Sequence, residues 1–332
     1  MKMLLEKRNY YKPFIYPWAY ELWQQHEKMH WLPQEVNLLN DVNDWHKRTS
    51  DDERELLTRL FRFFTQADVD VASGYTKLLL PRFWHPEIVM MLSSFAAREA
   101  IHMAAYSHLI DTLGIPEREY AAFTRYEAMC EKHDYVADYL RSDDVAQLAL
   151  GLAVFSAFTE GVQLFSSFAI LLHFSRTDDA IPQHKRGRYT GMGQIVSWSV
   201  RDESVHVEGN IKLFRQLMQE NPGVWTDGFR GQVYQACRDM VDLEDAFVDL
   251  MFDGVRLDGL TADDVKRYVR FVADKRLMQL GLKQNWGIEC HPISWMDIML
   301  SAVEHANFFE VRATEYTKGG LTGTWKDVWG CA

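Results

Sequence analysis

The chain has few of the features that mark secreted, disulfide-bonded or zinc-ribbon proteins. Its 332 residues include four cysteines, which are far apart and form no Cys-x-x-Cys pair: Cys130, Cys237, Cys290 and Cys331. Neither a disulfide framework nor a zinc ribbon is therefore predicted. The N-terminus, MKMLLEKRNYYKPF, lacks the uninterrupted apolar core of a signal peptide, so we expect a cytoplasmic protein that is not exported.

Negative charge exceeds positive charge, since 47 Asp and Glu against 36 Lys and Arg give a formal net charge of −11. A nucleic-acid binder needs clustered Lys and Arg to neutralise phosphates, so no nucleic-acid partner is expected. The most membrane-like stretch, residues 148–174, places Glu160 and Gln163 near its middle, where lipid would penalise a carboxylate. We predict a buried helix of a large bundle there, and no membrane partner.

Strands are not indicated, since no segment shows sustained two-residue alternation, whereas long segments show helical periodicity. The capping box at residues 50–53 (SDDE) opens a helix that runs to about Pro81. Pro86 opens a second helix, which Gly114 closes. Further helices are predicted at residues 116–140, 143–174, 190–219, 225–253, 261–280 and 293–311. The fold class is all-α, with residues 1–310 as a single domain that includes an N-terminal extension, and residues 311–332 as a flexible C-terminal tail.

Acidic and histidine residues interrupt the apolar core face of four of these helices. They are Asp68, then Glu99 with His102, then Glu160, then Glu203 with His206. Buried carboxylates are costly unless they are paired or bind a cation. In each Glu-x-x-His pair the two side chains are three positions apart, so they are neighbours on one helix face and can reach the same ion.

Four carboxylates and two imidazoles at this spacing are typical of di-iron or di-manganese sites inside four-helix bundles. Four negative charges nearly balance two divalent cations. Iron or manganese is favoured over zinc or copper on ligand hardness, because carboxylates outnumber histidines and no tetrathiolate is available. The sequence therefore predicts a ferritin-like helical bundle with additional helices and a dinuclear metal site in its four-helix core.

A single Glu-x-x-His pair is a weak signal, because two buried, hydrogen-bonded polar residues give the same pattern. Residues 26–30 (HEKMH) show this, since they contain such a pair and also match the HExxH form of zinc proteases. Their polar neighbours indicate no deep apolar helix and no third ligand stands out. We interpret residues 26–30 as a solvated helix end.

Tyr106 follows His102 by four positions, so it lies about 40° round the helix and about 6 Å further along it. This spacing places a phenol next to the predicted metals. A core tyrosine is the ordinary interpretation of a single Tyr. Leu164 and Phe168, four and eight residues after Glu160, are however placed to form a dry apolar wall around Tyr106.

With these residues assembled, the sequence resembles the small subunit of class I ribonucleotide reductase over nearly its full length, from YYKPFIYPWAYE onward. The segments that carry the resemblance are HWLPQEV (30–36), FFTQADVDVASGY (63–75), SFAAREAIHMAAYSHLIDTLG (94–114), FTEGVQLFSSFAILL (158–172), VRDESVHVEGNIKLF (200–214) and FFEVRATEY (308–316).

The resemblance implies the metal ligands: Asp68, Glu99 and His102 at one ion, and Glu160, Glu203 and His206 at the other. It implies that a metal pair, di-iron first with di-manganese or a mixed pair as alternatives, reacts with dioxygen and leaves a stored tyrosyl radical on Tyr106. The oxidising equivalent would pass to a cysteine of the large (alpha) subunit, which holds the ribonucleotide and reduces it to a deoxyribonucleotide. The chain would then be a homodimeric beta subunit of ribonucleoside-diphosphate reductase, active only with the large subunit.

The resemblance also implies a path of proton-coupled electron transfer toward the large subunit. Its residues are Trp31, Asp202, His102 and Tyr316. Without the family, Asp202 is interpreted as a carboxylate that orients a ligand imidazole, and the two aromatics as ordinary ones. The tail is a docking segment by the same resemblance, and Trp325 and Trp329 favour docking over a plain linker because aromatic residues commonly anchor interfaces.

Two other functions fit part of the pattern. A ferritin-like di-metal oxidase or oxygenase acting on an organic substrate would use the same ligands, but it would not need Trp31 or Tyr316. A metal-storage or scaffold protein would need the bundle and carboxylates alone. The extra helices and the placed tyrosine argue against storage.

Overall fold

The computed structural model describes residues 3–119, 122–138 and 144–300. The chain divides into two compact units, residues 1–294 and residues 295–332, and every element below belongs to the first. The predicted helix at residues 293–311 lies mostly outside the described residues, and the predicted tail lies wholly outside them. Both, with the predicted boundary near residue 310, stay predictions.

Helices dominate the described part of the chain, where no strand occurs and one isolated bridge joins Leu257 to Leu260. This confirms the all-α prediction. The longer elements are α1 (Pro17–Lys28), α2 (Leu39–Lys47), α3 (Asp51–Gly74), α4 (Pro86–Leu113), α5 (Glu127–Asp138), α6 (Val145–Leu152), α7 (Leu164–His173), α8 (Thr190–Glu220), α9 (Asp227–Phe252) and α10 (Ala262–Gln279). Two π-helical segments, η2 (Tyr75–Leu79) and η5 (Ala153–Gln163), continue α3 and join α6 to α7.

The helix ends follow their predicted signals. At the start of α3, the Ser50 side chain accepts a hydrogen bond from the Glu53 backbone N–H, and the Glu53 carboxylate accepts one from the Ser50 N–H. Pro86 occupies the first turn of α4, where its missing N–H costs nothing. Gly114 ends α4 with a positive φ of 75°, a conformation that glycine adopts without strain.

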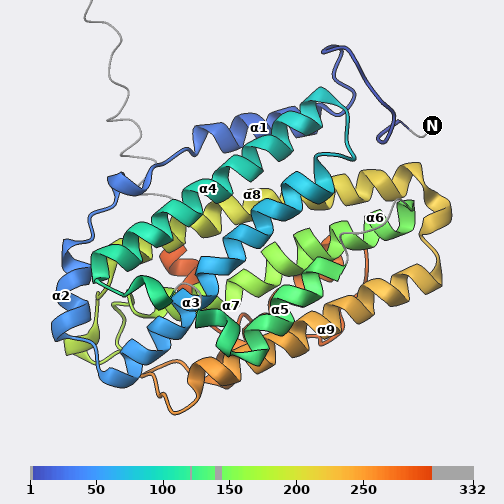
Figure 1. The fold of residues 1–332 in the computed structure, drawn as a ribbon. Helices are drawn as coiled ribbons and strands as arrows, with labels where there is room; N and C mark the ends of the chain where they lie inside the picture. The colour runs from blue at the N-terminus through green and yellow to red at the C-terminus, as the bar shows by residue number, and fades with distance from the viewer. Residues whose placement is uncertain (1–2, 120–121, 139–143, 301–332) are drawn as a thin grey trace, which may run out of the picture. The chain divides into compact units, whose positions relative to one another are not determined.

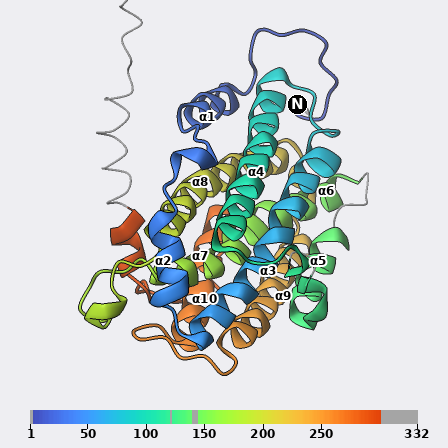
Figure 2. The ribbon, with the colours of Figure 1, turned by 60° about the vertical axis from the view of Figure 1, so that its left-hand side comes forward.

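Four helical segments form a closed ring around the core. Helix α3 packs on α4, α4 on α8, α8 on η5, and η5 on α3. Figures 1 and 2 show α3, α4 and α8 running beside the segment that contains α6 and α7. Helix α1 covers α4, while α9 and α10 pack on η5. The six predicted ligand positions lie on the four segments of this ring.

The predicted helix at residues 143–174 is helical as expected but changes type in its middle. Eleven residues form the wider π-helical segment η5, where the Thr159 hydroxyl bonds to the Val154 carbonyl five residues earlier. The carbonyl of Gly161 accepts a hydrogen bond from Arg276 Nε of α10 at 3.0 Å. Long π-helical stretches are rare and frequently mark functional sites.

This segment is also one of two helices long and apolar enough to cross a membrane by length and composition, the other being Pro86–Leu113. The apolar window of Val145–His173 is entirely buried inside the protein. A core helix of a bundle has the same composition as a membrane span. The prediction of a buried helix here is confirmed.

The predicted helix at residues 116–140 is wrong in its first half. Short 3₁₀ turns at Glu117–Glu119 and Ala122–Arg125 precede α5, which begins only at Glu127. Arg62 of α3 donates hydrogen bonds to the Glu119 carboxylate and to the Tyr126 hydroxyl, which ties this stretch to α3. Tertiary contacts therefore override the local helical pattern.

Candidate metal centre

Six acidic and histidine side chains from the four ring segments meet in the core. Asp68 comes from α3, Glu99 and His102 from α4, Glu160 from η5, and Glu203 and His206 from α8. Each of them is at most 2% exposed. They form two groups, Asp68 with Glu99 and His102, and Glu99 with Glu160, Glu203 and His206, and within each group the ligand atoms lie within 4.8 Å of one another.

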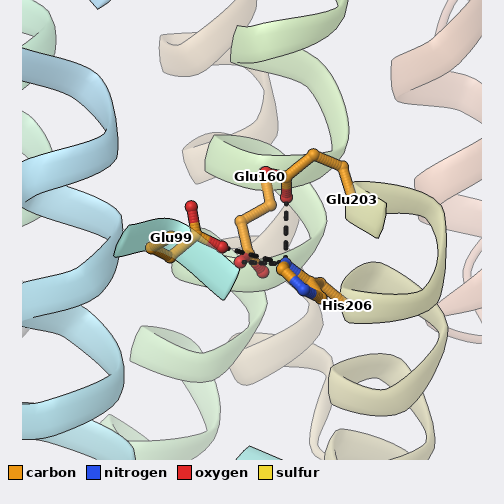
Figure 3. A group of neighbouring side chains, drawn as sticks. All are labelled: Glu99, Glu160, Glu203 and His206. Carbon is orange, nitrogen blue, oxygen red and sulfur yellow. Dashed lines mark ion pairs between the residues drawn. The ribbon is translucent and has the colours of Figure 1, made fainter. Parts of the chain in front are cut away.

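Glu99 and Glu203 each place one oxygen near either histidine. Glu99 Oε2 lies 3.3 Å from His102 Nδ1 and Glu99 Oε1 lies 3.1 Å from His206 Nδ1. Glu203 Oε1 and Oε2 lie 3.3 Å from the same two nitrogens. Figure 3 shows Glu99, Glu160 and Glu203 converging on His206, whose Nδ1 is also 3.6 Å from Glu160 Oε1. Each of these two glutamates therefore reaches both histidines, whereas the resemblance implied that Glu99 binds one ion and Glu203 the other.

The electrostatics of the cluster favour the binding of positive charge. Burial raises the pKa of the Asp68 carboxyl well above its ordinary value and raises the pKa of Glu160 to about 7. Burial lowers the pKa values of His102 and His206, but the neighbouring carboxylates raise both well above the ordinary histidine value. Without metal, the cluster therefore binds protons on the same side chains that would bind two divalent ions.

Several ligand atoms in the described part of the chain make no well-directed hydrogen bond, although some of them face one another at ion-pair distances. They are Asp68 Oδ2, Glu99 Oε1, both carboxylate oxygens of Glu203, and His206 Nδ1. A buried polar atom without a partner is expensive, and five such atoms gather in this one cluster. The donor set, carboxylate oxygen with some imidazole, fits iron or manganese. The residues present thus fit a pair of metal ions.

The outer side of His102 faces a polar chain that includes two other predicted residues. His102 Nε2 lies 3.3 Å from Asp202 Oδ2, to which the Trp31 indole N–H donates a hydrogen bond at 2.7 Å. Arg98 donates to the other oxygen, Asp202 Oδ1, at 2.7 Å. Although burial raises it, hydrogen bonds from His102 and the charge of Arg98 hold the pKa of Asp202 well below its usual range. Tyr316 lies outside the described residues, so its place on this path stays a prediction.

Tyr106 is buried one helical turn after His102 on α4. Its hydroxyl is 3.5 Å from Ser199 Oγ, and burial together with the charge of Asp68 raises its pKa. Leu164 and Phe168 are both buried, as the predicted apolar wall requires. Their contact with Tyr106 stays a prediction.

Tyr75 holds a proposed ligand in place, a role that the sequence pattern did not reveal. The Tyr75 hydroxyl donates to Glu160 Oε1 at 2.6 Å and accepts from Asn210 Nδ2 at 2.8 Å. Asn210 also donates to Glu160 Oε2 at 3.0 Å. The signal was present, because Tyr75 lies seven positions after Asp68, but its partners come from η5 and α8.

The interpretation of residues 26–30 as a solvated helix end is wrong for His26. This side chain is fully buried, on the same face of α1 as Ala19 and Leu22, and its Nε2 lies 3.1 Å from His206 Nε2. Burial, and next the nearby charge of His206, lower the pKa of His26 to about 2. Glu27 and His30 are exposed, as expected. The helical spacing of residues 19, 22 and 26 could have revealed the buried face.

Fold and cluster together define a ferritin-like helical protein with carboxylates and histidines gathered inside its four-helix core. Residues 8–292 match the family described as ribonucleotide reductase, small chain, and the chain belongs to this family. The match favours the small-subunit prediction over the oxidase and storage alternatives. Membership implies a large-subunit partner.

Relatives and solved structures agree with this assignment. The chain is 42% identical to the probable ribonucleoside-diphosphate reductase small subunit 376L of Invertebrate iridescent virus 6, over 98% of each chain. It is 28% identical to the ribonucleoside-diphosphate reductase subunit beta of Chlamydia pneumoniae, over 94% of this chain and 91% of that protein. The ribonucleotide reductase R2 subunit from Clostridium botulinum has a TM-score of 0.78 at 21% identity, covering 86% of this chain and 88% of that one. The dimanganese(II)-NrdF of Streptococcus sanguinis has a TM-score of 0.75 at 19% identity, covering 90% and 99%. At these identities the solved structures show a shared fold alone.

Proposed function

We propose that this chain is the radical-generating beta subunit of a ribonucleoside-diphosphate reductase. The observation that carries the proposal is the buried cluster of carboxylates and histidines, which lies near enough to the buried Tyr106 for the charge of Asp68 to raise the pKa of that phenol. The diphosphate substrate is proposed from the names of the relatives, which are ribonucleoside-diphosphate reductases. The homodimer and the cytoplasmic location stay predictions.

The proposed ligands divide between two metal positions. Asp68 and His102 would bind the first ion, and Glu160 and His206 the second. Glu99 and Glu203 are within reach of both positions, because each places one oxygen near either histidine, and they would help to hold both ions. When bound, the metal pair would supply the oxidising chemistry that uses dioxygen. Two iron ions are proposed first, with manganese as the alternative that the same ligands accept.

Tyr106 is the proposed site of the stored radical. Its burial keeps water from the phenol, and its raised pKa keeps the proton on the hydroxyl until the ring is oxidised. Oxidation removes one electron and that proton from Tyr106. The remaining unpaired electron is then held on a ring with no exposed edge.

Transfer to the large subunit would begin at the polar chain behind His102. Asp202 joins this imidazole to the buried indole of Trp31, and the Arg98 guanidinium balances the Asp202 charge. An ionised Asp202 can accept hydrogen bonds from both rings at once. The chain of contacts thus leads from a proposed ligand into the N-terminal extension, with Tyr316 as the proposed later step.

Electron paramagnetic resonance tests the proposal on protein loaded separately with Fe(II) plus dioxygen and with Mn(II). We expect a tyrosyl signal with one of the metals, lost in Tyr106→Phe and kept in Tyr189→Phe, which alters a buried tyrosine bound to Thr49 instead. A metal-centred signal that Tyr106→Phe leaves unchanged would assign the stored oxidant to the metals. No oxidised species with either metal would favour the oxidase or storage functions.

A further inference from the structure

His26 connects a proposed metal ligand to the protein surface. On one side, its Nε2 lies 3.1 Å from Nε2 of His206, and on the other its Nδ1 lies 2.7 Å from Ser94 Oγ. Ser94 is half-buried on α4, and its hydroxyl donates to Oε1 of the exposed Glu27 at 2.5 Å. Four side chains therefore form one line of hydrogen bonds from the cluster to solvent.

The direction of every bond in this line follows from counting protons. The Glu27 carboxylate only accepts hydrogen bonds, so the single hydroxyl proton of Ser94 points at Glu27. Ser94 Oγ must then accept from His26, which places a proton on His26 Nδ1. A neutral imidazole with a proton on Nδ1 carries a lone pair on Nε2. His26 Nε2 is therefore the acceptor and His206 Nε2–H the donor.

The same count settles what His206 presents to the cluster. With Nε2–H donating to His26, the lone pair that His206 offers once Nδ1 gives up its proton is on Nδ1, the nitrogen that faces Glu99, Glu160 and Glu203. A metal ion needs this lone pair. On the other histidine the partner is a carboxylate, because His102 Nε2 faces Asp202. The two imidazoles are thus oriented by groups of different chemistry.

We propose that His26 is a positioning residue for the second metal position, which holds the His206 ring with Nδ1 free to bind metal. The inference deepens the proposed function and rests on its assignment of His206 as a ligand. His26 binds no metal itself, since its two ring nitrogens are engaged by Ser94 and His206. The first histidine of the HExxH match at residues 26–30 therefore has a role, but as the hydrogen-bond partner of a proposed metal ligand.

The first test needs neither metal nor substitution in the measured sample. Long-range ¹⁵N–¹H NMR of histidine-labelled, metal-free protein reports which ring nitrogen of each histidine carries hydrogen. We expect His26 to be protonated on Nδ1 and bare on Nε2, with its resonances assigned by their absence from His26→Gln. A His26 ring protonated on Nε2 would overturn the proposal, because it could not accept from His206.

The second test is Mn(II) titration of His26→Phe and His26→Gln, followed by the resonance of free Mn(II). Phenylalanine keeps an aromatic ring but removes the acceptor, so the second equivalent should bind about 10- to 100-fold more weakly while the first is unchanged. Glutamine supplies a carbonyl oxygen as acceptor and should restore most of the affinity for the second equivalent of Mn(II). Two equivalents bound by His26→Phe as tightly as by the unchanged protein would overturn the proposal.

A matched control separates positioning from general damage. His173 is another buried histidine, on α7, and its near neighbour is Arg176 rather than the cluster. His173→Phe should keep both Mn(II) equivalents. If His26→Phe fails to fold, the NMR measurement still decides. If the unchanged protein forms no tyrosyl radical while both tests succeed, the proposed function fails and the positioning role of His26 stands.

Discussion

The indole N–H of Trp31 donates a hydrogen bond to Asp202 Oδ2 at 2.7 Å, although 171 positions separate the two residues. Asp202 is completely buried, and the same oxygen faces His102. One carboxylate thus ties the N-terminal extension to a proposed metal ligand. Three separate parts of the sequence meet in this contact.

Replacement of Trp31 should separate radical storage from radical transfer. Trp31→Phe removes the donor to a buried carboxylate, and a hydrogen bond to a charged group contributes about 1.5–3 kcal/mol. We expect that loss in the free energy of unfolding, a retained Tyr106 signal, and loss of nucleotide reduction with the large subunit. Denaturant unfolding, paramagnetic resonance and a reduction assay measure the three. Full turnover in Trp31→Phe would remove Trp31 from the path.

Tyr75 should matter to the stability of the metal-free protein. Tyr75→Phe leaves Glu160 Oε1 without its donor, and an unsatisfied buried group costs about 1–3 kcal/mol. Tyr189→Phe is the matched control, because its hydroxyl bonds to the neutral hydroxyl of Thr49. Urea unfolding compares the two variants. A smaller loss in Tyr75→Phe than in Tyr189→Phe would contradict the structural role.

Metal affinity should rise with pH. The pKa values of His102 and His206 are raised well above the ordinary value. In the metal-free protein both imidazoles therefore stay in their charged form, protonated on both ring nitrogens, at neutral pH. A metal ion must displace these protons, and its affinity therefore increases by about tenfold per pH unit for each proton released. Calorimetric Mn(II) titration in two buffers of different ionisation enthalpy counts the protons. Identical heats in both buffers would exclude proton release.

Glu53 should stabilise the fold at neutral pH and lose its effect in acid. Burial alone would raise its pKa, but the bidentate pair with Arg188, at 2.9 Å for both contacts, lowers it to about 2 from the ordinary 4.5. The unfolded chain therefore binds the proton first as pH falls. The difference corresponds to about 3 kcal/mol, present above about pH 4.5 and lost toward pH 2.

Glu53→Gln tests this pH dependence through urea unfolding between neutral pH and about pH 3. The difference in the free energy of unfolding between the unchanged protein and Glu53→Gln should shrink as the pH falls. Glu208→Gln is the control, since its exposed pair with Lys212 should contribute less than about 1 kcal/mol. A gap that stays constant with pH would contradict the assignment.

Two helical glycines should respond to alanine with opposite signs. The Phe155 ring of η5 occupies the space that a Cβ at Gly74 would need, whereas Gly231 on α9 is exposed and has nothing within 4 Å of that position. Gly74→Ala should cost about 1–3 kcal/mol through overpacking. Gly231→Ala should instead add about 0.5–1 kcal/mol, because alanine has the higher helix propensity. Thermal unfolding of the pair measures both, and a stabilised Gly74→Ala would show that α3 and η5 pack more loosely.

The sequence by itself determined the helices and the face on which each proposed ligand lies. Periodicity is a local property, so Glu99 and His102 share a face of α4 wherever that helix packs, and a glycine such as Gly114 ends a helix through its own backbone freedom. The burial of Asp68 and Glu203 followed from their places among apolar residues at helical spacing. These features depend on neighbours within a few positions.

Only the tertiary structure decided which distant groups surround those ligands. The π-helical turns that carry Glu160 pack against α8, α9 and α10, and an α-helix with the same apolar pattern would look identical in the sequence. The contact between His26 and His206 joins residues 180 positions apart, and the bond from Tyr75 to Glu160 spans 85. Such contacts are set by how whole helices pack, because the periodicity of one helix contains no information about which side chain of another will face it.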